Sequence, residues 1–423
     1  MFERVADCFT DHRDPRRIEH SVQELLGQRL LGLACGYEDL NDHDRLRDDP
    51  VLALASGKKE LVGRRRRQQD EGHLLAGRST LNRLELTPRG ATSDARYKKI
   101  ELHDDRVERL LVELFIDQHD EPPEELILDL DATDDPLHGH QEGRFFHGYY
   151  RCYCYLPLYI FCGDFPLCAM LRPSSIDGAS GTVEQLERIV PQLRERWPEV
   201  RIIIRADSGF AREAIMAWCE ANDVDFVLGL ARNSRLEEKL EEPMERMRER
   251  VARTKEAART YREFRYRTQK TWSRSRRVVG KAERLVGKDN PRFVVTSLSP
   301  KEWGKRALYE ELYCARGDME NRIKEQQLDM FADRTSTGTM RGNQIRLWLS
   351  TLAYVLMATM RRVGLHSTRM ERAQCGTIRC QLLKIPARMT VSVRRVALSL
   401  SSIFPLKELF AVALDRLRAW AVA

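Results

Sequence analysis

The sequence lacks any hydrophobic run long enough to span a membrane. The longest apolar stretch near the C-terminus, LWLSTLAYVLMATM, has 14 residues, whereas a membrane-spanning helix needs about 20. The opening segment, MFERVADCFTDHRDPRR, has no apolar core of the kind found in a secretory signal. We therefore expect a cytoplasmic protein with no membrane partner, and we interpret the apolar stretch as a buried helix.

The sequence also lacks cysteine motifs for metal binding and groups for covalent catalysis. Its ten cysteines include no pair of CxxC motifs, which predicts free structural thiols. His138, His140 and His147 could indicate zinc, but they have no fourth soft ligand at a suitable spacing, and polar loop residues are the alternative. No Ser/His/Asp triad or Cys/His pair is evident.

Positive charge is present but unevenly distributed. The 423-residue chain is 42% hydrophobic, which is enough for a large core, and its net charge is +7. Residues 251–290 contain 13 Lys or Arg against 4 Asp or Glu, and residues 321–423 contain 17 against 6. Such local excesses favour a polyanion, most commonly nucleic acid, although solvated surfaces are the alternative.

The first 115 residues predict small helices without a catalytic cluster. SVQELLGQRLLGLACGY has helical periodicity, and GRSTLNRLEL predicts a helix that begins at Ser79 or Thr80. The arginine run at 64–67 and the neighbourhood of Arg83 could contact DNA phosphates, but exposed loop arginines are the alternative.

From Glu125 onward the pattern becomes that of a sheet. EELILDLDA, FFHGYYRCYCYLPLYIFC and FPLCAMLRP predict three consecutive strands, which suggests an antiparallel meander. Helical and strand segments then alternate as far as DFVLGLA, so the predicted order is β-β-β-α-β-α-β in a mixed α/β sheet. A charged segment and further strands after Ala231 predict a basic insertion that ends near Pro300.

Carboxylates occur where two of these strands end. Asp129 and Asp131 share one face of their strand because side chains two residues apart point the same way. RIIIRADSG delivers Asp207 to the carboxyl end of a second strand, and that edge is where open α/β sheets build sites. Two such aspartates can hold a divalent metal through oxygen ligands, whereas an Asx-type turn is the alternative for Asp131.

A helix over YCARGDMENRIKEQQ supplies a third acidic candidate. At 100° per residue, one arc of about 80° contains five side chains, which are those of Tyr313, Arg316, Glu320, Lys324 and Gln327. A separate stripe of Leu312, Met319, Ile323 and Met330 predicts the buried face. Gly317 within the helix suggests a close approach, and an ordinary amphipathic helix with a Glu320–Lys324 pair is the alternative.

Taken together, DLDAT, RADSGF and YCARGDMENRIKE resemble the three catalytic motifs of bacterial insertion-sequence DDE transposases. The resemblance is to insertion-sequence family 1380, within the group that carries a Tyr-Arg-Glu-Lys signature. GYEDLNDHDRLRDDP, LAGRSTLNRLE, DDPLHGHQEG and YLPLYIF extend it over nearly the whole chain. The resemblance already covers the residues next to Met1, so we expect that a few leading residues of the family pattern are missing from this chain.

The resemblance implies a role for each matching residue. Asp131, Asp207 and Glu320 match the catalytic, metal-binding carboxylates, with Asp129 as the rival for the first position. Tyr313 and Arg316 match the signature residues that bind phosphates near the cleavage point. The signature lysine position holds Gln327 instead, and Lys324 could supply that charge. Two Mg²⁺ ions, or Mn²⁺ as a substitute, would serve phosphodiester hydrolysis and strand transfer.

The resemblance also implies an architecture and partners. It predicts a ribonuclease-H-like core, a cut-and-paste transposase acting on terminal inverted repeats and target DNA, and a homodimer in the synaptic complex. A DNA nuclease without strand transfer and an inactive DNA-binding derivative are the alternatives. The expected regions are a helical DNA-binding region (1–115), the first core part (116–231), a basic β-rich insertion (232–300), the second core part (301–365), and a C-terminal helical region suited to dimerisation (366–423).

Overall fold

A computed structural model describes residues 1–59, 61, 73–392 and 395–421. The arginine run at 64–67 lies outside these residues. The N-terminal region consists of short helices and one two-stranded sheet, in the order α1 (Phe2–Ala6), β1 (Phe9–Asp11), α2 (Val22–Ala34), α3 (His43–Leu46), α4 (Pro50–Ala55), α5 (Arg78–Glu85), β2 (Ile100–Leu102) and α6 (Asp104–Ile116).

Two of these helices begin differently. Ser21 starts α2 with a capping box, in which its hydroxyl accepts from the Glu24 backbone N–H and the Glu24 carboxylate accepts from the Ser21 N–H. Gly77 precedes α5 without a side-chain cap. This helix begins at Arg78, so the predicted start at Ser79 or Thr80 was one or two residues late.

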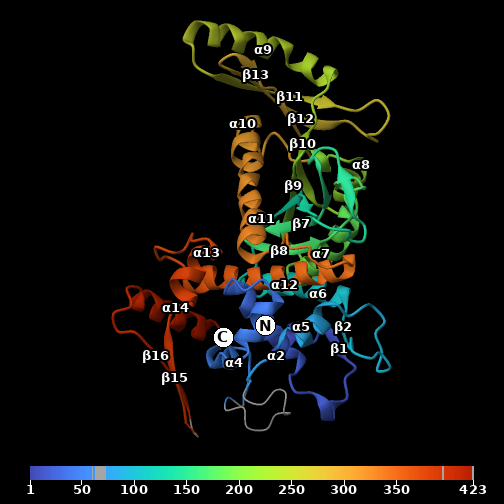
Figure 1. Cartoon of the computed structure of the whole chain (residues 1–423). Helices are drawn as coiled ribbons and strands as arrows, with labels where there is room; N and C mark the ends of the chain where they lie inside the picture. The colour runs from blue at the N-terminus through green and yellow to red at the C-terminus, as the bar shows by residue number, and fades with distance from the viewer. Residues whose placement is uncertain (60, 62–72, 393–394, 422–423) are drawn as a thin grey trace.

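A single large mixed sheet forms the centre of the molecule (Figure 1), which confirms the predicted mixed α/β class. Its strand order is β11-β12-β14-β10-β9-β3-β7-β8, with β13 paired to β12 at one edge. The strands are β3 (Glu125–Ala132), β7 (Leu158–Cys162), β8 (Phe165–Met170), β9 (Arg201–Ala206), β10 (Asp225–Leu230), β11 (Ala258–Tyr266), β12 (Arg276–Leu285), β13 (Lys288–Asp289) and β14 (Arg292–Thr296).

The direction of the central strands follows from their connections. The tight turn between β7 and β8 makes that pair antiparallel, and β3 is antiparallel to β7. Helices α7 (Thr182–Arg196) and α8 (Glu213–Ala221) make the longer connections that parallel pairing requires, so β3, β9 and β10 run parallel. The β-β-β-α-β-α-β order of the main sheet is therefore as predicted.

The second predicted strand is an exception. Residues 145–162 form three strands rather than one, and only β7 belongs to the main sheet. β5 (Phe145–His147) and β6 (Cys152–Tyr155) join β4 (Asp135–Pro136) in a separate small sheet. Pro157 lies between β6 and β7, where it interrupts the run because it cannot donate a ladder hydrogen bond.

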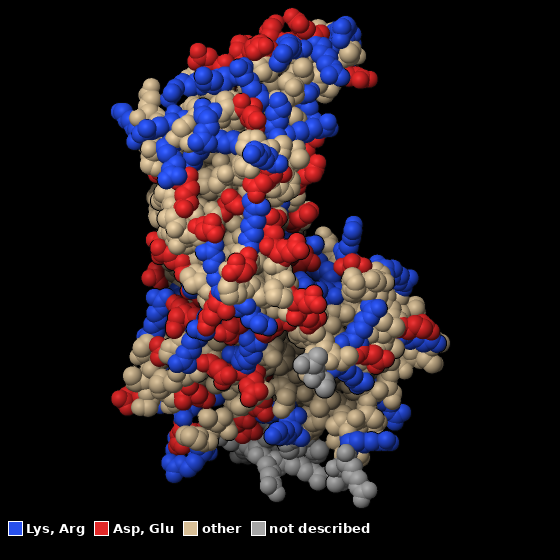
Figure 2. Space-filling model, turned by 180° about the vertical axis from the view of Figure 1, so that it is seen from behind, with Lys and Arg blue, Asp and Glu red and all other residues tan. Residues whose placement is uncertain are grey.

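The predicted insertion extends the main sheet and adds a long helix. The charged segment after Ala231 forms α9 (Ser234–Thr254), a helix that was not predicted from the sequence. It buries a stripe of Leu236, Leu240, Met244, Met247 and Val251, and it packs on β11 and β12. This arm occupies one end of the molecule in Figure 1, and Figure 2 shows dense Lys and Arg over the same end.

The chain then returns through one long helical segment at residues 305–330. It starts as α10 (Lys305–Ala307), passes through a π-helical turn (Leu308–Tyr313) and a 3-10 turn (Cys314–Arg316), and continues as α11 (Gly317–Met330). The predicted inner stripe of Leu312, Met319, Ile323 and Met330 is buried. A Cβ atom added to Gly317 would meet no neighbouring group within 4 Å, so the predicted close approach at this glycine is wrong.

The following helix, α12 (Met340–Thr359), links the sheet to the N-terminal region. It contacts β8 on one side and α2 and α5 on another, as its position across the middle of Figure 1 indicates. Most of LWLSTLAYVLMATM lies in this helix and is buried, as predicted. Among the helices in the described residues, none is long and apolar enough to cross a membrane. The ten cysteines are free, as expected.

The C-terminal region contains more than the helices that were predicted. After a π-helical turn (Met360–Gly364) come α13 (Cys375–Ile378) and a second π-helical turn (Arg379–Leu383). An antiparallel hairpin of β15 (Ala387–Val391) and β16 (Val396–Leu400) follows, before α14 (Lys407–Trp420). The expected helical C-terminal region did not include this hairpin at residues 387–400, where β-branched residues such as Thr390, Val391 and Val396 favour strands.

Candidate active site

The pairing of β3 with β9 brings two aspartates together at one sheet edge. Asp129 pairs with Arg205 and Leu130 with Ala206 in parallel register. Asp131 follows Leu130 and Asp207 follows Ala206. Their side chains therefore lie next to each other on the same face of the sheet. Asp207 also starts a 3-10 turn, Ser208–Phe210, and its Oδ1 accepts a 2.8 Å hydrogen bond from the Gly209 N–H.

The long helix brings a third carboxylate and a guanidinium to the same place. Arg316 donates from Nη2 to Glu320 Oε1 at 2.5 Å. Burial alone would lower the pKa of Arg316, but the carboxylates of Glu320, Asp131 and Asp207 raise it. Arg316 is therefore the positive charge around which the three acids gather.

The surroundings of Asp131 disfavour its charged form. Burial raises its pKa to about 6, Arg316 opposes that shift, and the negative charges of Asp207 and Glu320 add to it. Within the part of the chain that the structure describes, no three His, Cys, Asp or Glu side chains form a group that could hold a metal ion as they stand. Glu320 instead satisfies its charge with Arg316.

Tyr313 reaches the same site from the π-helical turn. A Cβ atom added to Gly229 of β10 would lie 2.6 Å from the Tyr313 hydroxyl and 2.8 Å from the Ser208 backbone N. Only glycine lets β10 approach both groups this closely. Gly229 was not among the residues singled out from the sequence, although a glycine inside the strand DFVLGL signals such an approach.

The remaining two residues of the predicted polar arc have different surroundings. Lys324 is exposed on α11. Gln327 donates from Nε2 to the Asp134 carbonyl at 3.3 Å and to Asp135 Oδ1 at 3.0 Å. The predicted arc assumed 100° per residue throughout, which does not hold across the π-helical and 3-10 turns at residues 308–316.

Asp135, the partner of Gln327, is a buried carboxyl with few contacts. Its side chain is fully enclosed, and its Oδ2 has no hydrogen-bond partner among the described residues. Burial raises the pKa of Asp135 to about 8, while the hydrogen bond from Gln327 opposes that shift. Asp135 is therefore protonated at neutral pH, and a neutral amide at position 327 is compatible with it.

Asp129, the rival for the first carboxylate, is already paired. Its two oxygens accept from Arg205 Nε at 2.5 Å and Nη2 at 2.8 Å, with both side chains buried. Arg205 Nη1 also donates to the Leu312 carbonyl at 2.7 Å. This bidentate pair joins β3, β9 and the long helix, which gives Asp129 a structural role.

Two of the three histidines in the HGHQEGRFFH segment contact neighbouring side chains. His140 Nδ1 lies 3.1 Å from Arg144 Nη1, and His147 packs against the Tyr150 ring. Neither His138, His140 nor His147 belongs to a metal-binding group within the described residues. The contacts with Arg144 and Tyr150 are of the kind that the polar-loop alternative predicts.

The different roles of Asp129 and Asp131 predict opposite effects on stability. Asp129→Asn leaves the buried Arg205 charge without its partner and should lower the free energy of unfolding by about 3 kcal/mol. Asp131→Asn removes a carboxylate that is repelled by its neighbours, so stability should stay unchanged or rise. Urea unfolding of both variants at pH 7 measures this difference, and equal losses would contradict the assignment.

The buried Asp135 predicts a pH-dependent stability. Between the unfolded pKa near 3.8 and the folded pKa of about 8, the folded state holds a proton that the unfolded state has lost. Stability from this group is therefore lost as pH rises, by up to about 1.4 kcal/mol per pH unit. Asp135→Asn should remove this dependence. In thermal melts, the melting temperature of the variant should therefore rise relative to that of the native protein between pH 5 and pH 8. A constant difference would count against a protonated Asp135.

Comparison with known proteins places the chain in a family. A search of curated protein sequences found no significant match. A cryo-EM structure of the piggyBac transposase synaptic complex with hairpin DNA is similar over 84% of this chain and 75% of that chain, with 10% identity and a TM-score of 0.34, too low to carry an argument. The family model for Transposase DDE domain group 1 matches residues 1–422. The chain therefore belongs to this family of DDE transposases.

Proposed function

We propose that the protein is a cut-and-paste DNA transposase of insertion-sequence family 1380. It binds the terminal inverted repeats of its own element, cleaves them and joins the ends to target DNA. The observation that carries the proposal is the convergence of Asp131, Asp207 and Glu320 around Arg316 at the carboxyl edge of the central strands. Arg316 balances one of these three negative charges, and a bound divalent cation would neutralise the others.

The core is proposed to be ribonuclease-H-like. The strand order β8-β7-β3-β9-β10 supports this, with β7 antiparallel to β3 and with β3, β9 and β10 parallel. Asp131 lies near the end of β3, Asp207 directly follows the neighbouring parallel strand β9, and Glu320 comes from a helix beyond the insertion. A ligand at this edge is consistent with the general placement of sites in α/β sheets.

The donor set fits a divalent cation. Asp131, Asp207 and Glu320 offer only carboxylate oxygens, which are the ligands that Mg²⁺ and Mn²⁺ prefer. Glu320 would exchange its bond to Arg316 for the metal. Two such ions, when bound, supply an activated water or 3′ hydroxyl and stabilise the leaving oxygen in phosphodiester chemistry.

Residues of the chain itself position the DNA phosphates. Arg316, released from Glu320, can donate to a phosphate next to the carboxylates, and Tyr313 can donate from its hydroxyl beside Asp207. Lys324, exposed on the same helix, adds a positive charge. Gln327 is occupied with Asp135, so we assign it to support of the loop after β3 rather than to phosphate binding.

The proposed partners follow from this activity. Double-stranded DNA, as inverted repeats and as target, suits the Lys and Arg that gather over the insertion (Figure 2). Arg265 and Lys270 in this arm have no carboxylate partner among the described residues, so they remain available to phosphates. We further propose that two copies of the chain act in a synaptic homodimer in the bacterial cytoplasm.

Conservative changes of the three carboxylates test the activity. Asp131→Asn, Asp207→Asn and Glu320→Gln should each abolish cleavage while they preserve binding to the ends, because the metal needs the charges and the fold does not. The assay uses a duplex carrying the DNA that flanks this coding region, with Mg²⁺ or EDTA. Metal-dependent nicking without any joined product would favour a nuclease, and binding without cleavage would favour an inactive derivative.

Replacement of Arg316 tests its phosphate role separately. Arg316→Ala should weaken binding to the cleaved end and reduce the slope of log K against log salt by about one, because one phosphate contact is lost. Lys305→Ala, which changes an exposed residue at the start of the same helical segment, is a matched charge control. A salt slope equal to that of the native protein would contradict the assignment.

A further inference from the structure

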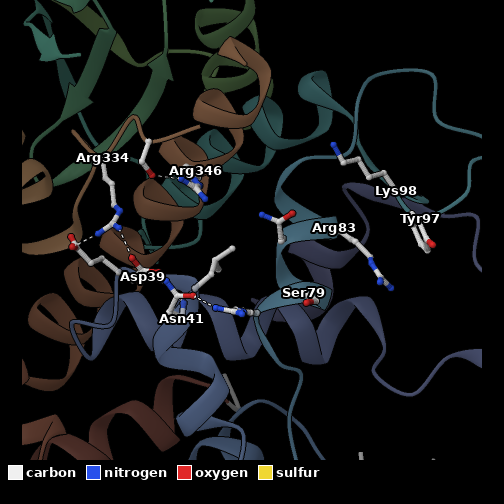
Figure 3. Close-up of a pocket in the computed structure, with 13 residues that line it drawn as sticks. Asp39, Asn41, Ser79, Arg83, Tyr97, Lys98, Arg334 and Arg346 are labelled. Atoms are coloured by element: carbon white, nitrogen blue, oxygen red, sulfur yellow. Dashed lines mark hydrogen bonds and ion pairs between the residues drawn. The ribbon is translucent and has the colours of Figure 1, made fainter. Parts of the chain in front are cut away.

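A polar pocket lies between the N-terminal helices and the segment that joins α11 to α12. Its volume is about 600 Å³. Figure 3 shows Arg334 and Arg346 on one side of the hollow and Arg83, Tyr97 and Lys98 on the other. The lining also includes Glu38, Asp39, Leu40, Asn41, Arg78, Ser79, Asn82 and Ser336. None of these residues takes part in the carboxylate site.

The two sides of this pocket differ in how their charges are satisfied. Arg334 is paired with Glu38 and Asp39, and Arg346 with Glu85, so that side is neutralised within the protein. Arg83 and Lys98 have no carboxylate partner among the described residues. The Arg83 guanidinium lies 5.0 Å from the centre of the Tyr97 ring, which orients it without neutralising its charge.

Helix α5 presents a polar face at this pocket and is rigidly held on its other face. Ser79, Asn82 and Arg83 are exposed, whereas Leu81, Leu84 and Glu85 are buried. Glu85 accepts from Arg29 Nε of α2 at 2.6 Å and from Arg346 Nε of α12 at 2.8 Å. The exposed side chains are therefore carried by a helix that is fixed to the body of the protein. A surface that recognises a ligand needs such a rigid support.

We propose that α5 recognises the base sequence of the terminal inverted repeat, an inference that rests on the proposed function. Asn82 and Arg83 contact base edges in the major groove, and Lys98 contacts a phosphate beside the pocket. The chemistry matches, because Asn pairs well with adenine and Arg with guanine in that groove. Ser79 and Lys98 have side chains of the kind that typically contact the sugar-phosphate backbone of DNA.

One helix links the carboxylates to the segment that lines the pocket. Helix α11 carries Glu320 near one end and reaches the pocket segment after its other end, at Met330. Ten residues of α-helix span about 15 Å, which equals roughly four or five base pairs of rise. The carboxylates are therefore joined through one helix to the wall of the pocket that Arg334 and Ser336 supply.

Binding measurements with two duplexes test this assignment. One probe carries the end sequence that flanks the coding region, and the other has the same composition in scrambled order. In fluorescence anisotropy at fixed salt, Arg83→Ala and Asn82→Ala should each weaken binding to the end sequence about tenfold or more, with little change on the scrambled duplex. Lys98→Ala should weaken binding to both duplexes and reduce the salt slope.

Two controls separate sequence reading from charge. Arg83→Lys keeps the charge but loses bidentate geometry, so it should lose the end-sequence preference and retain scrambled-duplex affinity. Arg196→Ala removes an exposed arginine of α7 outside the pocket and should leave the preference intact. If Arg83→Ala behaves like Arg196→Ala while the native protein prefers the end sequence, the inference fails and the proposed function stands. A native protein with no preference overturns both.

Discussion

The buried pair of Asp129 and Arg205 is the interaction on which the rest of the site depends. It fixes the register between β3 and β9, and through the Leu312 carbonyl it also fixes the long helix against both strands. A slip of one residue would turn the β3 side chains to the opposite face. The Asp129–Arg205 ion pair therefore holds Asp131 and Asp207 next to each other, although neither of them takes part in it.

The carboxylates themselves oppose folding, and the surrounding protein compensates for them. Three acids at one sheet edge repel each other, and Arg316 supplies the cation that lets them stay close without a ligand. The β-sheet, the buried pair and the long helix provide the stability that this cluster does not. Such local conflict within an otherwise consistent fold is typical of a functional site.

The sequence predicted the parts of the molecule whose signals are local. Apolar strands that end in Asp131 and Asp207 could be recognised because each signal lies within a few residues. The helix at 234–254 was missed because its charge obscured a regular apolar stripe, and the strand predicted over residues 145–162 was split by a proline. The pairing of Gln327 with Asp135 could not be predicted, because it joins elements far apart in the chain.

The π-helical turn before Tyr313 decides how the long helix faces the site. In a regular α-helix each residue advances by about 100°, so one residue accommodated in a π bulge changes the phase of everything beyond it. Here Tyr313 belongs to that turn, whereas Glu320 belongs to the regular helix that follows. A chain one residue shorter between 308 and 312 would gain a straighter and more regular helix. Its α10 and α11 would then be turned by about 100° relative to each other, so the irregular turn lets α10 pack on β11 while α11 presents Glu320 to the carboxylate site.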